Sequence, residues 1–252
     1  QLLWNRGIRT RDDAGRFLNP DYGRDTHDPF RMKNMERAVE RILRAIENKE
    51  KIIVFGDYDA DGVCGAGVFA DFFRAIRYEA YDIYNPDRFK EGYGLTPKAL
   101  AALYERGANL IITVDTGVTS FEEIEDAQKR GIDVIVIDHH LVPPKWPPAY
   151  AILDPRQEDE TYPYTGLSGA GLAFKTVSAI LSRKSFGLVA GWEKWLLDLV
   201  AIAAVADIVP LLGENRALVY WGLEVMKKGR RLGLVALART ASLNMAHVSA
   251  TD

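Results

Sequence analysis

The sequence predicts an α/β fold, a parallel sheet flanked by helices, followed by a helical C-terminal part. Three short runs rich in Val and Ile, at 52–55, 110–114 and 133–137, are separated by segments in which apolar residues recur at helical spacing. Uninterrupted apolar runs are typical of parallel strands that are buried on both faces. An aspartate follows each run, after one glycine in the first and directly in the other two. Since parallel strands deliver binding groups at their carboxyl ends, we expect the functional site there.

The first half of the chain alternates helices with strands. Apolar residues recur at helical spacing over 35–51, ahead of the first apolar run. Thr96 and Pro97 suit the N-cap and the first position of a helix, and 119–122 fit a capping box. The expected elements are helix 35–51, strand 52–55, helix 63–76, strand 80–84, helix 97–106, strand 110–114, a helix opened by 119–122, and strand 133–137.

The second half is mostly helical. The proline-rich segment 142–148 indicates a loop, and a short strand is expected at 149–153, ahead of an Asp-Pro pair. Beyond Gly166 the spacing of apolar residues predicts three helices, at about 170–183, 192–206 and 215–228.

Composition excludes some classes of protein. With 252 residues, of which 48% are hydrophobic, the chain can bury a sizeable core. The apolar stretch 195–206 is interrupted by Asp198 and falls short of the ~18 residues that span a bilayer, so we expect no membrane partner. A single cysteine, Cys64, precludes an internal disulfide and suits a cytoplasmic protein. The chain starts at Gln1 without an apolar leader, and we expect an excerpt without a secretion signal.

The loop after the first strand holds three carboxylates, Asp57, Asp59 and Asp61. With Gly62 they reproduce half of a calcium EF-hand loop. The closing position is Val68 instead of Glu, however, and a strand precedes the loop, which argues against that motif. A dinucleotide site is also disfavoured, because the carboxylates would repel a pyrophosphate. Helix capping explains one of the three acids, and the repulsion among them calls for a counter-charge.

The remaining candidates complete a metal site. Asp115 follows the second apolar run, and His139 and His140 follow the acid after the third, so that one imidazole can ligate a metal while the other faces substrate. Asp207 lies where an apolar helix should end, near the negative pole of its dipole, and this position needs positive charge nearby. Carboxylates with an imidazole and no thiolate favour manganese or magnesium. Two such ions that share a carboxylate hydrolyse phosphoesters or phosphoanhydrides.

Basic and aromatic residues near these acids are candidates for substrate contacts. Arg88 and Lys90 could reach phosphate while Tyr93 stacks on a base, and the alternative is a charged surface loop. Ser168 and Gly169 precede a helix whose free N–H groups suit a phosphate, although simple capping explains them equally well. Weaker signals come from Asn215, Arg216 and the basic cluster 227–231, which is most simply a solvated helix end.

Several blocks together resemble the DHH phosphoesterase superfamily, named for a triad that here is Asp138-His139-His140, and within it the RecJ family of single-strand-specific exonucleases. The resemblance implies a Rossmann-like DHH catalytic domain over 51–228, a helical and extended lead-in at 1–50, and at 229–252 the start of a connector to a second domain. The blocks that carry the resemblance are 56–62, 87–95, 113–115, 167–175 and 206–211.

The resemblance also implies an activity: a 5′→3′ exonuclease that degrades single-stranded DNA to 5′-mononucleotides in DNA repair and recombination. A helicase or a single-strand-binding protein would be its protein partner. The alternative enzyme is a DHH-type hydrolase of short oligonucleotides or cyclic dinucleotides. A non-enzymatic replication scaffold of the same fold should have lost several metal ligands, and this sequence keeps the acids and both histidines.

The ligands of two divalent ions, manganese preferred or magnesium, follow from the same resemblance. A histidine that completes one shell in related pyrophosphatases is replaced here by Phe55, and Asp57 could compensate. His140 would contact the scissile phosphate and stabilise charge in the transition state. The implied ligands are Asp59 and Asp115 on one ion, and Asp61, Asp115, His139 and Asp207 on the other.

Overall fold

A five-stranded, fully parallel sheet forms the centre of the molecule, as predicted. The computed structural model describes residues 1–141 and 143–251. Its strands are β1 (Ile52–Gly56), β2 (Tyr81–Tyr84), β3 (Leu110–Val114), β4 (Asp133–Ile137) and β5 (Ala151–Leu153). They are arranged in the order β2-β1-β3-β4-β5. Every residue of β1 and β3 is buried, because these strands are covered on both faces.

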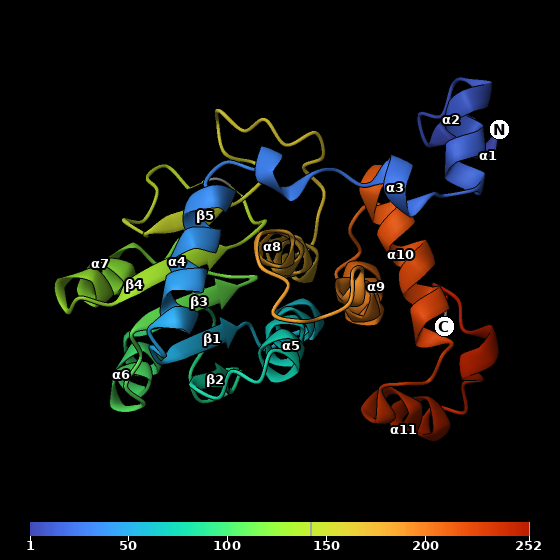
Figure 1. Cartoon of the computed structure of the whole chain (residues 1–252). Coiled ribbons are helices and arrows are strands. Elements are labelled where there is room, and N and C mark those ends of the chain that lie inside the picture. The colour runs from blue at the N-terminus through green and yellow to red at the C-terminus, as the bar shows by residue number, and fades with distance from the viewer. Residues whose placement is uncertain (142, 252) are drawn as a thin grey trace.

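Helices cover both faces of the sheet. They are α4 (Met35–Glu47), α5 (Ala60–Ala75), α6 (Pro97–Glu105), α7 (Phe121–Lys129), α8 (Gly169–Arg183) and α9 (Leu197–Ala206). Since alternate strand residues point to opposite sides, Val54 and Ile112 join a core with α4, α5 and α8, whereas Ile53 and Ile111 join a second core with α6 and α7. Figure 1 shows α5, α8 and α9 grouped beyond the arrowheads of the strands.

The C-terminal part is helical, as the sequence predicts. Apart from Asp198, the residues of helix α9 are apolar on all sides, which suits a helix that packs among α5, α8 and α10 (Gly213–Met226). The helix expected at 192–206 begins instead with a 3-10 turn, Trp192–Leu196, a common tightening of a helix start. Helix α11 (Leu232–Thr240) and a further 3-10 turn, Met245–His247, complete this part.

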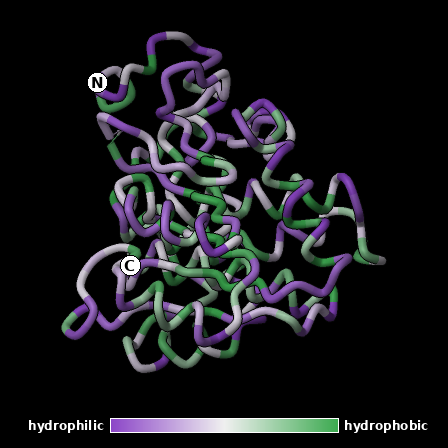
Figure 2. Tube along the Cα trace, turned by 90° about the vertical axis from the view of Figure 1, so that its left-hand side faces the viewer, coloured by the Kyte–Doolittle hydropathy of each residue, from purple (hydrophilic) through white to green (hydrophobic). Residues whose placement is uncertain are grey.

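The N-terminal lead-in runs beside the C-terminal helices. Its elements are α1 (Leu2–Asn5), α2 (Arg11–Leu18), α3 (Tyr22–Asp25) and a 3-10 turn, Pro29–Arg31. Figure 1 shows α3 next to the start of α10, and Figure 2 shows a largely hydrophilic trace around the N-terminus. A buried ion pair between Lys175 and Glu214, 2.8 Å apart, joins α8 to α10, and the backbone N–H of His27 also donates to Glu214. These bonds attach the N-terminal lead-in to α8 and α10.

Two predicted helix starts need correction. The capping box at 119–122 is not formed, because α7 begins one residue later than the box requires, and its N-cap Ser120 makes no side-chain capping bond. The helix predicted from 63 begins at Ala60. It starts early because Asp59 is its N-cap, with a carboxylate that accepts from the N–H groups of Asp61 and Gly62 at 2.9 and 3.0 Å.

The basic cluster 227–231 is not a simple solvated helix end. Arg231 donates to the buried Asp198 of α9 at 2.9 Å and to Asp71 of α5 at 2.6 Å, and these bonds pin the start of α11 to the core. Of the loop predicted at 142–148, Val142 lies outside the described residues. In the described part of the chain no helix is long and apolar enough to cross a membrane.

Candidate metal centre

Three aspartates occupy one row at the carboxyl edge of the sheet. Asp57 follows β1, Asp115 follows β3 and Asp138 follows β4. Each backbone N–H continues the ladder by donating to the last carbonyl of the next strand, at 3.2, 2.9 and 3.1 Å respectively. Neighbouring parallel strands therefore present these carboxylates side by side, as the sequence predicts.

The loop after β1 turns back tightly over the strand end. A Cβ on Gly62 would lie 2.4 Å from the backbone nitrogen of Asp57, so the turn requires glycine. It places Asp61 in the first turn of α5, pointing inward and 1% exposed. Burial raises the pKa of Asp61. The N–H groups of Gly169 and Ala170, at 2.6 and 2.7 Å, oppose that rise and hold the carboxylate at the start of α8.

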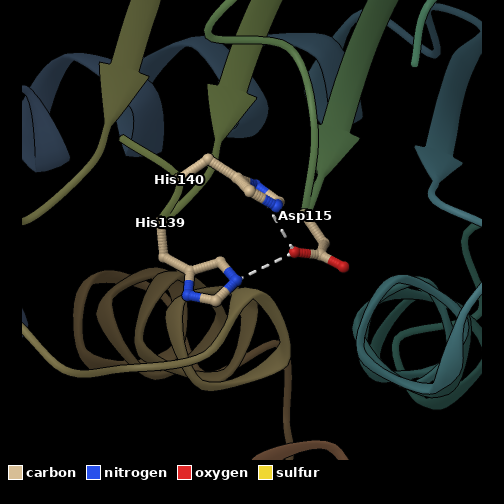
Figure 3. A group of neighbouring side chains, drawn as sticks. All are labelled: Asp115, His139 and His140. Atoms are coloured by element: carbon tan, nitrogen blue, oxygen red, sulfur yellow. Dashed lines mark hydrogen bonds and ion pairs between the residues drawn. The ribbon is translucent and has the colours of Figure 1, made fainter. Parts of the chain in front are cut away.

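Three carboxylates converge on one nitrogen of His139. Its Nε2 lies 3.0 Å from Asp115, 3.5 Å from Asp61 and 3.6 Å from Asp207. Figure 3 shows His139 and His140 both turned toward the same oxygen of Asp115. Asp207 is the C-cap of α9, so the helix end expected to deliver an acid does so. The ligand atoms of Asp61, His139 and Asp207 lie within 4.8 Å of one another, and we call this group the His139 subsite.

A second group consists of Asp57, Asp59 and Asp115, also within 4.8 Å of one another, and we call it the Asp57 subsite. Asp57 Oδ1 is buried and has no hydrogen-bond partner among the described residues, so it is free to bind a cation. Asp115 lies between the subsites, because it also contacts His139. Carboxylates with one imidazole fit a hard divalent cation such as Mn²⁺ or Mg²⁺.

Both the backbone conformation and the burial of Asp115 are energetically unfavourable. Its φ of +63° lies in the left-handed region that few non-glycine residues adopt. The residue is 2% exposed. Burial, followed by the charges of Asp61 and Asp59, raises the pKa of its carboxyl to about 10. Burial also raises the pKa of Asp57. A bound cation would remove both penalties.

His140 is oriented by Asp138, the first acid of the triad. Its Nδ1 lies 2.7 Å from Asp138 Oδ1, which also accepts the backbone N–H groups of both histidines. Burial raises the pKa of Asp138, but the bond and the charge of His140, together with the backbone N–H groups of Val118 and His139, outweigh burial, and the pKa falls below its usual value. The same bond raises the pKa of His140. His140 Nε2 lies 3.3 Å from the Tyr93 hydroxyl. The sequence did not reveal this positioning role of Asp138.

Of the residues predicted to contact substrate, Arg88 and Tyr93 both contact Tyr58, whereas Lys90 makes an ion pair with Asp87. Tyr93 meets the ring of Tyr58 edge-on, and the guanidinium of Arg88 lies 5.1 Å from the centre of the Tyr58 ring. Lys90 instead pairs with Asp87 at 3.1 Å and is largely exposed. Tyr58 was not among the predicted residues, and its place between two ligand aspartates is the one sequence signal that could have found it.

Ser168 and Gly169 do not form an open phosphate site. The Ser168 hydroxyl caps α8 by accepting from the N–H of Gly171 at 3.2 Å, and the N–H of Gly169 is taken by Asp61. A Cβ on Gly169 would lie 2.7 Å from the Cβ of Asp115, so glycine permits close packing of α8 against the acids. The capping alternative therefore holds. Asp61 is 108 residues distant in the chain, and local pattern cannot reveal such a partner.

Comparison with known proteins agrees with this geometry. The family model described as "DHH family, N-terminal domain" matches residues 51–204. The single-stranded-DNA-specific exonuclease RecJ of Bacillus subtilis (strain 168) is 43% identical over 238 residues, which are 94% of this chain and 29% of that protein. Its namesake from Escherichia coli (strain K12) is 36% identical over 264 residues, 100% of this chain and 44% of that protein. The chain thus spans less than half the length of these relatives.

Solved structures share the fold. A crystal structure of exonuclease RecJ bound to manganese matches with a TM-score of 0.77 at 30% identity, over 87% of this chain and 54% of that one. RecJ in complex with Mn²⁺ from Thermus thermophilus matches with a TM-score of 0.75 at 29% identity, over 96% of this chain and 33% of that one. The family match runs from β1 into α9 and includes every aspartate of the two subsites except Asp207, and the chain therefore belongs to the DHH family.

Proposed function

We propose that this chain is the catalytic part of a single-strand-specific DNA exonuclease that digests from the 5′ end to 5′-mononucleotides, in DNA repair and recombination. The convergence of Asp61, Asp115 and Asp207 on His139 Nε2 carries the proposal, because such an acidic cluster calls for bound cations. Relatives named as single-stranded-DNA-specific exonucleases support the substrate. Residues 51–228 are the catalytic domain in this proposal, and 229–252 begin a connector.

Two divalent ions fit the two subsites, manganese preferred or magnesium. The RecJ structures described with Mn²⁺ or Mg²⁺ support this choice. One ion is assigned to Asp57, Asp59 and Asp115, and the other to the His139 subsite together with Asp115, which both ions share. Asp57 is included because its buried Oδ1 has no other partner in the described part of the chain. When bound, the ions supply charge for the phosphate and lower the pKa of the attacking water.

His140 and its neighbours act on the substrate side. Asp138 favours the protonated form of His140, which is placed to donate a proton or hydrogen bond to the phosphate or its leaving oxygen. Tyr93 limits the position of that ring from the other side. Arg88 supplies charge beside the Tyr58 and Tyr93 rings, a combination suited to a phosphate backbone with stacked bases.

Neither alternative function is favoured. A hydrolase of short oligonucleotides or cyclic dinucleotides would use the same ions, but relatives up to 43% identical are named for single-stranded DNA. A scaffold without activity would have lost ligands, whereas both subsites here are assembled. The proposal includes a helicase or single-strand-binding protein as the partner that presents the strand, and the cytoplasm as the place of action.

The test uses the full-length protein that contains this chain, with Mn²⁺ and end-labelled single strands, duplexes and dinucleotides. We expect mononucleotides released first from the 5′ end of single strands. Asp115→Ala should abolish turnover, whereas Glu125→Gln, which changes an exposed acid on α7, should not. A preference for dinucleotides over long strands would refute the exonuclease assignment, and activity of Asp115→Ala within about tenfold of wild type would refute the shared ligand.

A further inference from the structure

Asn215 connects two loops through one buried side chain. It lies in the first turn of α10 and is 1% exposed. Its amide donates to the carbonyl of Gly166 at 2.6 Å and to the carbonyl of Pro210 at 3.1 Å. The Tyr164 hydroxyl donates to the same Pro210 carbonyl at 3.0 Å. The amide therefore fixes the loop before α8 relative to the loop after α9.

Each of these loops leads to a ligand of the His139 subsite. Pro210 lies three residues after Asp207. Gly166 lies three residues before Gly169, whose N–H donates to Asp61 at 2.6 Å. Asn215 therefore sets the spacing between the segment that carries one ligand and the segment that holds another.

Asp207 depends on such support. Within the described residues no hydrogen bond is donated to its carboxylate, and the contact from His139 is 3.6 Å long. The next residue, Ile208, has a φ of +57° and is 87% exposed. A β-branched residue in the left-handed region is strained, so contacts elsewhere must hold the turn. Backbone bonds from the N–H groups of Ile208 and Val209 to the carbonyls of Val205 and Ala204, both at 3.2 Å, close the turn itself, and the bonds at Pro210 attach the segment that follows it to the start of α10 and to Tyr164.

We propose that Asn215 is a positioning residue for the ion bound by the His139 subsite. The inference rests on the proposed metal centre, and it identifies a side chain outside that centre that controls one ion and not the other. Asn215 acts through Pro210 on Asp207 and through Gly166 on the N–H groups that hold Asp61. Removing side chains that orient metal ligands typically weakens the metal about 10- to 100-fold. The ion of the Asp57 subsite should keep its affinity.

Asn85, an exposed residue, provides a control that makes the same kind of bonds. Its amide also donates to two backbone carbonyls, those of Gly56 and Asp57, at 3.0 and 2.9 Å. These carbonyls belong to the loop of the Asp57 subsite. Asn85→Ala therefore removes the same kind of side chain and the same number of bonds at the other subsite. It should leave the ion of the His139 subsite within about twofold of its wild-type affinity, the usual scatter between independent sites.

The experiment titrates metal-free protein with Mn²⁺ in the absence of DNA, by electron paramagnetic resonance and calorimetry. Asp207→Asn and Asp59→Asn identify the two ions, because each change removes a ligand of one subsite. In Asn215→Ala the ion lost in Asp207→Asn should bind about 10- to 100-fold more weakly. The ion lost in Asp59→Asn should bind within about twofold of wild type. Adding Asn215→Ala to Asp207→Asn should weaken the remaining ion no further.

Several results would overturn the inference. Equal weakening of both ions, or an equal effect from Asn85→Ala on the His139 subsite, would show a general loss of stability instead. Wild-type protein that binds no Mn²⁺ would overturn the proposed metal centre itself, a distinct outcome. If thermal unfolding shows that Asn215→Ala does not fold, Tyr164→Phe removes only the second bond to Pro210. It should weaken the same ion about 2- to 10-fold, and an unchanged affinity would overturn the inference.

Discussion

Replacing Asp115 by Asn should stabilise the metal-free protein while removing its metal binding. The substitution keeps the shape of the side chain and removes its charge. Asparagine adopts the left-handed backbone conformation readily, so the φ of +63° at this position is no obstacle. The effect on the free energy of unfolding then comes mainly from the buried carboxyl group.

The pKa of Asp115 gives the size and the sign of this effect. Its value is about 10 in the folded protein against 3.8 for an ordinary carboxyl. Below its unfolded pKa, a carboxyl with a raised folded pKa does not reduce the free energy of unfolding. As pH rises from the unfolded pKa toward the folded pKa, the unfolded chain releases the proton more readily than the folded protein, and the free energy of unfolding falls. At pH 8 the loss amounts to about 6 kcal/mol, at about 1.4 kcal/mol per pH unit above 3.8. The buried amide of Asn has its own cost, so we expect a net gain of about 2–4 kcal/mol.

Urea unfolding in EDTA, followed at pH 8 and pH 5, measures this gain. It should be smaller at pH 5, where wild-type Asp115 keeps its proton at little cost. In Mn²⁺ at about 100 times its dissociation constant the order should reverse, because each bound ion stabilises wild type by about 2.7 kcal/mol. An Asp115→Asn protein that is no more stable than wild type in EDTA at pH 8 would refute the argument from burial and charge. Retention of both ions would refute the shared ligand.

Two further predictions concern the neighbouring acids. Asp154 directly follows β5 and is buried, and burial raises its pKa to about 6. Asp154→Asn should therefore gain up to about 3 kcal/mol in EDTA at pH 7.5 and little at pH 4. A gain that does not change with pH would count against this cause. Asp138→Asn keeps an acceptor for the backbone N–H groups but weakens the hydrogen bond that orients His140. Nuclease turnover should therefore fall about 10- to 100-fold, while Mn²⁺ affinity stays within about twofold. An equal fall in turnover and affinity would contradict the positioning role.

The sheet edge could be predicted from sequence because its geometry is local and regular. Buried Val and Ile runs indicate parallel strands, and the residue after each strand takes the next position in the ladder. Asp57, Asp115 and Asp138 follow this rule without reference to the rest of the chain. Asp207 could be predicted for a related reason, since an acid at the C-terminal end of an apolar helix needs a cation nearby.

The contacts that hold the ligands could not be predicted, because they join distant segments. The N–H of Gly169 meets Asp61 only after α5 and α8 pack together, and from sequence the same N–H looked available to a phosphate. Tyr58 joins Arg88 to Tyr93 through ring contacts that no spacing rule encodes. The capping box predicted at 119–122 was wrong for a different reason. The local sequence pattern is present, but helix α7 starts one residue later than the pattern requires.

The position of the metal-site aspartates in the fold is related to the free energy that their burial costs. A folded domain is stable by only about 5–15 kcal/mol, so one carboxyl with the pKa of Asp115 consumes a large part of that margin when no cation is bound. Asp57 and Asp115 directly follow β1 and β3, whose residues are all buried and whose apolar side chains belong to the two main cores. Elements with this much buried apolar surface can hold repelling charges in place. Asp207 instead follows α9 on a partly exposed turn, where the backbone bonds of the turn to Ala204 and Val205 are supplemented by the bonds at Pro210.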